Sequence, residues 1–202
     1  LRQWVNYGTV LEAGPPGSWD DRAIWTGSVT IRDGLAYMFY TALSRAEKVP
    51  VQRIGLAVST DLVHWERDPG NPLLEVDTRW YEPQGTEQKE AQTWRDPYVV
   101  YSSDEETYYM FLSARVHHGP HDGRGVIGLA RSTNLLSWKV LPPVSPPGDF
   151  TEMEVPQVVF ANGRYYLLFC AARHSAVRLS PTGATYWWGT HYLVADKLTG
   201  PY

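Results

Sequence analysis

The chain lacks several features that mark particular classes of protein. A single cysteine among 202 residues excludes a disulfide within the chain, so the redox compartment stays open. No apolar run approaches the roughly 18 residues that a membrane-spanning helix needs, so we expect no membrane partner. The chain has 18 Lys and Arg against 22 Asp and Glu, a net charge of −4, and no basic cluster that could follow a phosphate backbone. We therefore expect no nucleic-acid partner.

Two further features concern the ends and the thiol. Cys170 lies in the apolar run 165–170, which predicts a buried, unreactive side chain. The chain begins at Leu1 with neither a Met nor a signal peptide, which favours a processed product or a fragment. Localisation stays unknown on this basis, with secreted and cytoplasmic both open.

The chain repeats itself. No segment shows sustained helical periodicity, and 17 Gly and 15 Pro interrupt short runs of β-forming residues. The segment 33–42 recurs at 105–114 and at 162–171, each time as a polar turn followed by a strand-like run. A second element, 54–65 (IGLAVSTDLVHW), recurs at 127–138 (IGLARSTNLLSW).

These two elements together predict four antiparallel strands per repeat, which is the blade of a β-propeller. We expect an all-β fold in one domain over residues 1–202, with blades at about 20–75, 92–145 and 154–202. Propellers close with roughly four to eight blades, so three blades are an incomplete propeller. We expect further chain elsewhere, or an oligomer if this chain is complete.

The residues that open the inner strand of each blade are the candidates for chemistry. They are Trp25 and Thr26 in the first blade, Arg95 and Asp96 in the second, and Glu154 in the third. Pro97 follows Asp96, Pro156 lies two residues after Glu154, and we expect Asp96 and Glu154 to occupy equivalent positions of neighbouring blades. Two carboxylates that converge on one pocket are what cleavage of a glycosidic bond requires.

These phrases resemble a known family. The order Trp-Thr-Gly-Ser, Arg-Asp-Pro and Glu-Val-Pro, with Ser-Thr-Asp-Leu-Val-His-Trp between the first two, is similar to the five-bladed propellers of glycoside hydrolase family 32 and its clan J relatives. That family includes invertases, inulinases and levanases. The resemblance covers nearly the whole chain and implies about three of five blades, the first being absent.

The resemblance also implies roles for residues. Glu154 would be the general acid/base, Asp96 would stabilise the transition state, and Arg95, Trp25 and Thr26 would bind the substrate, a β-fructoside such as sucrose or a fructan. The implied mechanism is a retaining double displacement. The family's nucleophilic Asp has no match here. We place the nucleophile outside the chain, since the upstream acids Asp20 and Asp21 belong to a turn before Trp25.

Several alternatives stay open. Val155 stands where family 32 has Cys, and the phrase Glu-Met-Glu-Val-Pro-Gln leans toward transferase-like relatives or toward the pentose-specific family 43 on the same fold. A non-catalytic sugar-binding propeller is a rival of another class. Glu152 is expected to be a solvated charge at a strand edge, with a hydrogen-bonding second carboxylate as the alternative. The loop 117–122 holds three His and an Asp, but their spacing fits no closed metal site. We expect no metal and no cofactor.

Overall fold

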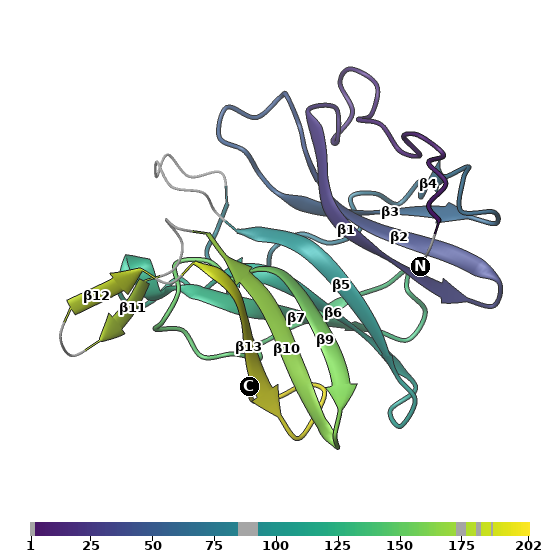
Figure 1. Ribbon diagram of the computed structural model, residues 1–202. Helices are drawn as coiled ribbons and strands as arrows, with labels where there is room; N and C mark the ends of the chain where they lie inside the picture. Colours follow the sequence, from purple (N-terminus) through teal and green to yellow (C-terminus); the bar gives the residue numbers. More distant parts are fainter. Residues whose placement is uncertain (1–2, 85–92, 173–176, 181–182, 187) are drawn as a thin grey trace.

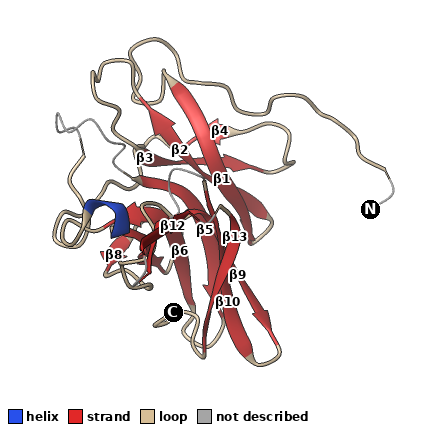
Figure 2. Cartoon of the chain, turned by 60° about the vertical axis from the view of Figure 1, so that its left-hand side comes forward, coloured by secondary structure: helices blue, strands red, loops and turns tan. Residues whose placement is uncertain are grey.

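The computed structural model describes residues 3–84, 93–172, 177–180, 183–186 and 188–202. In this part of the chain the only helix is one short 3₁₀ turn, η1 (His121–Gly123), and the rest of the regular structure is strand (Figures 1 and 2). The prediction of an all-β propeller fold is confirmed. Within the described residues, no helix is long and apolar enough to cross a membrane.

Two complete antiparallel sheets follow one another along the chain. The first is ordered β1 (Ala23–Arg32), β2 (Leu35–Leu43), β3 (Arg53–Ser59) and β4 (Glu66–Arg67). The second repeats this order with β5 (Trp94–Ser102), β6 (Thr107–Arg115), β7 (Gly125–Ser132) and β8 (Lys139–Leu141). Each is the four-stranded unit that the repeats predict.

The third sheet is built differently in the part that the structure describes. It contains β9 (Glu154–Ala161), β10 (Arg164–Ala171) and β13 (Gly189–Ala195), ordered β13-β10-β9. A separate hairpin, β11 (Val177–Ser180) with β12 (Gly183–Tyr186), lies between β10 and β13 in the sequence. All three sheets lie within the predicted blade limits, while the division into one domain stays a prediction.

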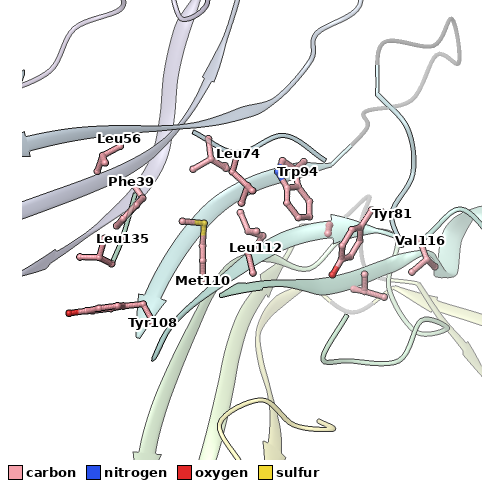
Figure 3. Close-up of a cluster of buried hydrophobic side chains, with 14 residues drawn as sticks. Phe39, Leu56, Leu74, Tyr81, Trp94, Tyr108, Met110, Leu112, Val116 and Leu135 are labelled. Atoms are coloured by element: carbon pink, nitrogen blue, oxygen red, sulfur yellow. The ribbon is translucent and has the colours of Figure 1, made fainter. Parts of the chain in front are cut away.

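The middle sheet is buried on both faces because β6 is apolar at successive positions. Side chains alternate between the two faces of a strand, so Met110 and Leu112 pack toward the first sheet while Tyr109 and Phe111 pack toward the third. Figure 3 shows the first of these clusters, where Phe39 faces Met110 across the gap between sheets. Each sheet thus covers an apolar face of its neighbour.

The inner strands β1, β5 and β9 lie side by side, with β5 in contact with both others (Figure 1). Each carries one extra residue near its start relative to its partner strand. The register shifts fall between Ile24 and Gly27, between Arg95 and Tyr98, and opposite Leu168 and Cys170. Such bulges bend a strand and re-aim its side chains.

The register corrects one expectation about the two carboxylates. Arg95 pairs with Ser113, and Glu154 pairs with Cys170, which is the matching position of the repeat. Glu154 is therefore equivalent to Arg95, and Asp96 is equivalent to Val155. Asp96 and Val155 also share a left-handed backbone, with φ of 58° and 51°. The prediction that the two acids share one position is wrong by one residue, because the equivalent residues are Pro97 and Pro156 and not the two carboxylates.

The prediction for the thiol is also wrong. Cys170 is exposed, with Sγ 3.9 Å from the hydroxyl of Thr190 on β13. The neighbouring β10 residues Leu167 and Phe169 are buried. The apolar run that contains Cys170 does not bury every residue because β10 turns alternate side chains toward opposite faces.

Candidate active site

A cavity of about 360 Å³ opens where the starts of the three inner strands meet. All five residues that the sequence singled out line it, together with two that it did not assign to the site. The lining residues are Trp25, Thr26, Gln52, Arg95, Asp96, Glu154 and Val155. Because the strands run in the same direction, residues 70 and 59 positions apart come together at one end of the fold (Figure 1).

Arg95 is the electrostatic centre of the cavity. Its side chain is nearly buried, and Nη2 lies 2.8 Å from Glu154 Oε1 and 3.1 Å from Glu152 Oε2. Its Nε lies 3.6 Å from Asp96 Oδ2. Burial works to lower the pKa of Arg95, but these three carboxylates outweigh it and raise the pKa, so the guanidinium stays charged.

Glu152 is a buried partner of Arg95, not the solvated edge charge that the sequence favoured. Its Oε1 accepts a hydrogen bond of 2.7 Å from the Thr93 hydroxyl, and only 7% of the residue is exposed. Burial works to raise the pKa of Glu152, but the charge of Arg95 and the hydrogen bonds from Thr93 and Arg95 lower it overall. The alternative of a hydrogen-bonding second carboxylate is the one the structure supports.

Asp96 joins three strands through its own groups. Its backbone N–H donates to Thr41 Oγ1 on β2 at 2.9 Å, and its Oδ2 accepts the backbone N–H of Val155 on β9 at 3.0 Å. A non-glycine residue with positive φ is uncommon, and such strain gathers at functional sites. The Asp96 carboxylate is therefore held in one place at the cavity wall.

Trp25 and Gln52 complete the wall on the first sheet. Trp25 is 45% exposed and lines the cavity, so aromatic surface is available to a ligand there. Gln52 precedes β3, and its Oε1 accepts the backbone N–H of Trp94 at 2.8 Å. The side chain of Gln84 holds the Gln52 main chain through two bonds, to its N–H at 2.6 Å and its carbonyl at 2.9 Å. No sequence signal identified Gln52, because it lies in a loop outside the repeated phrases.

The other acids and histidines that the sequence raised lie elsewhere. Asp20 is fully buried and bound to Arg67 Nε at 2.7 Å, and Asp21 accepts the backbone N–H of Arg45 at 2.7 Å. Neither lines the cavity. His121 lies between β6 and β7, and its Nε2 is 2.9 Å from Arg115 Nη2. Among the described residues, no three His, Cys, Asp or Glu are grouped to hold a metal ion.

Comparison with known proteins places the chain in a family. The description "Glycosyl hydrolases family 32 N-terminal domain" matches residues 1–200. The chain belongs to glycoside hydrolase family 32. This family 32 chain is 24% identical, over 230 residues, to the levansucrase of Erwinia amylovora, covering all of this chain and 53% of that protein. It thus spans about half the length of this curated relative.

Solved structures agree on the fold. The inulosucrase of Halalkalicoccus jeotgali bound to kestose superimposes with a TM-score of 0.76 at 27% identity, over 97% of this family 32 chain and 52% of that one. The levansucrase of Bacillus subtilis gives a TM-score of 0.70 at 18% identity, over 91% and 52%. The Bombyx mori β-fructofuranosidase gives 0.63 at 18%, over 84% and 33%. The last two likenesses show the fold alone.

Proposed function

We propose that the protein is a glycosidase acting on β-fructofuranosides such as sucrose or fructans, with Glu154 as general acid/base. The observation that carries this proposal is the convergence of Glu154, Asp96 and Arg95 on one cavity beside Trp25. Family membership and relatives named levansucrase, inulosucrase and β-fructofuranosidase support the substrate class.

The roles follow from the groups at the cavity. Glu154 protonates the glycosidic oxygen as the bond to the anomeric carbon breaks, and a carboxylate nucleophile forms a bond to that carbon. Glu154 then takes a proton from the incoming water, which displaces the nucleophile. While Glu154 carries the proton, Arg95 keeps Glu152 and Asp96 as partners. The buried cation is therefore never left without a countercharge.

The other residues that line the cavity place the substrate. Asp96 accepts hydrogen bonds from sugar hydroxyls, the ring of Trp25 packs against the sugar face, and Thr26 adds a hydroxyl beside it. Among the described residues that line the cavity, Asp96 and Glu154 are the carboxylates. We place the nucleophile in a part of the protein outside this sequence. A non-catalytic sugar-binding propeller is the second candidate, favoured by a cavity whose described lining supplies two carboxylates, Asp96 and Glu154.

The test is sugar release from sucrose, inulin and levan by the whole protein, including the part that supplies the nucleophile, and by its Glu154→Gln variant. We expect the substitution to lower kcat by about 10²–10⁴-fold, the usual contribution of a general acid/base. Glu106→Gln, at the β5–β6 turn, is the matched control and should change nothing. Release that survives Glu154→Gln overturns the assignment. Binding of kestose without release by the whole protein would support the sugar-binding alternative.

A further inference from the structure

A second buried arginine lies behind the active site. Arg115, the last residue of β6, is 2% exposed, and every nitrogen of its guanidinium has a partner. Nε donates to Glu82 Oε2 at 2.8 Å and Nη1 donates to the carbonyl oxygen of Thr151. Nη2 donates to the carbonyl oxygen of His121 at 3.1 Å and lies 2.9 Å from the ring nitrogen Nε2 of the same residue.

Glu82 and Arg124 complete this group, which we name the Arg115 cluster (Glu82, Arg115 and Arg124). The second carboxylate oxygen of Glu82 accepts from Arg124 Nη1 at 2.7 Å, and the Glu82 N–H donates to the Arg115 carbonyl at 2.8 Å. Arg124 Nε also donates to the Gly119 carbonyl at 2.9 Å. Two guanidinium groups share one carboxylate, so the cluster keeps a net positive charge.

The cluster reaches the active site through the main chain. The Thr151 carbonyl that Arg115 holds directly precedes Glu152. Two further hydrogen bonds hold the residues before Glu152. The Gly125 N–H donates to the Phe150 carbonyl at 2.8 Å, and the Thr151 hydroxyl donates to the Asp122 carbonyl at 3.0 Å. Glu152 in turn binds Arg95. The two buried arginines are thus linked through two adjacent residues, Thr151 and Glu152.

We propose that the Arg115 cluster is a positioning device for the reaction, which holds Glu152, and through Arg95 also Glu154, in the geometry that the cavity needs. The proposal rests on the function proposed above. A buried ion pair often contributes little to stability compared with apolar side chains of similar volume. Specific placement of the Glu152–Glu154 segment gives the cluster a role that stability alone does not.

Charge acts in addition to placement. Burial raises the pKa of Glu152, while Arg95 and Thr93 lower it. The positive charge of Arg115 also lowers this pKa, by a smaller amount. Removal of that charge should therefore raise the pKa of Glu152 and weaken its hold on Arg95 at mildly acidic pH. A planar fork that donates from all three of its nitrogens is not replaced by the single ammonium of Lys.

The experiment compares Arg115→Met and Arg115→Lys with a structural control, Arg67→Met. Arg67 holds the fully buried Asp20 but does not line the cavity, so its loss costs stability without touching the segment before Glu152. The readouts are kcat and KM for sucrose and the pKa of Glu152, followed by NMR with ¹³C-labelled Glu carboxyls. The NMR titration needs no catalysis, so it decides this proposal even if the chain releases no sugar.

We expect Arg115→Met to raise the pKa of Glu152 and to lower kcat by about 10–100-fold, the scale of a small misplacement of reacting groups. Arg115→Lys should keep the pKa low yet still lower kcat. Arg67→Met should change neither. A folded Arg115→Met variant with the pKa of Glu152 and kcat both unchanged overturns the proposal.

A second variant guards against loss of folding. If Arg115→Met does not fold, Glu82→Gln loosens Arg115 while leaving its charge in place, and the same fall in kcat is expected. Equal kcat in Glu82→Gln and the unmodified protein, in an active preparation, also counts against the proposal. If the unmodified chain is inactive, an unchanged carboxyl chemical shift of Glu152 in Glu82→Gln overturns the proposal as well.

Discussion

The two copies of the Ser-Thr-Asp/Asn turn and the three strand starts follow opposite rules, although both belong to the same repeat. Ser59 Oγ accepts the backbone N–H of Leu62 at 2.8 Å, and Ser132 Oγ accepts that of Leu135 at 2.9 Å. Trp65 donates to the Leu62 carbonyl at 3.1 Å, and Trp138 repeats this bond to Leu135 at 3.0 Å. Both leucines have φ near 68°.

The strand starts share a backbone bulge but not their side chains. The positions of Trp25, Arg95 and Glu154 are equivalent, and they carry an aromatic ring, a cation and a carboxylate. At the turns, the same contacts recur because they close the blade. At the strand starts, the scaffold delivers a different group from each blade to one cavity. Residues that repeat therefore mark structure, and residues that diverge at repeated positions mark the site.

The largest difference between the two regions is expected when a carboxylate in each is replaced by its amide. We expect Asp96→Asn to lower kcat by about 10²–10³-fold, as for loss of one transition-state interaction, with little change in Tm because Asn still accepts the Val155 N–H. Asp61→Asn in the turn is the matched control, since Asn134 already fills the equivalent place. Sugar-release kinetics and thermal melts of both variants check this. Equal activity losses would contradict the division.

A second substitution tests whether the strand start also depends on its backbone. An added Cβ at Gly27 would meet the Phe39 carbonyl oxygen at 2.1 Å, and that atom belongs to the neighbouring strand. We expect Gly27→Ala to lower the free energy of unfolding by about 1–3 kcal/mol and to disturb the adjacent Trp25 and Thr26. Urea unfolding followed by circular dichroism measures the loss.

The control for this substitution is Gly163→Ala. A Cβ at Gly163 would meet no atom within 4 Å, but its φ of 77° makes Ala mildly unfavourable there. The loss at Gly163 should be smaller than at Gly27 and should leave sugar release unchanged. A larger loss at Gly163 would mean that backbone conformation, and not the contact with Phe39, sets the cost.

The smallest effects are expected in the two Ser-Thr-Asp/Asn turns. Ser59→Ala and Ser132→Ala each remove a hydroxyl that accepts two backbone N–H groups, at positions 61 and 62 and at positions 134 and 135. We expect each to lower the free energy of unfolding by about 1 kcal/mol, with unchanged kcat. Denaturant melts of the two variants should agree closely, and a clear difference between them would show that the two turns are not equivalent.

Much of the fold was readable because its signals are local. Runs of β-forming residues such as 107–115, and the polar turns before them, predicted the strands and their order. The same repeat, aligned on the two carboxylates, matched Asp96 with Glu154, whereas alignment on Pro97 and Pro156 matches Asp96 with Val155, as the register shows. It also predicted a buried Cys170, because the face of a strand depends on what packs against it.

Most of the strands, the family and five residues of the site could be predicted from the sequence, because short repeated phrases and turn chemistry act over a few neighbouring residues. How these residues interact depends on the tertiary structure. The sharing of Arg95 between Glu152 and Glu154, the place of Gln52 in the wall, and the link from Arg115 to Glu152 depend on groups that are 36 to 59 positions apart. Such contacts arise from packing of separate sheets, and no local pattern specifies them.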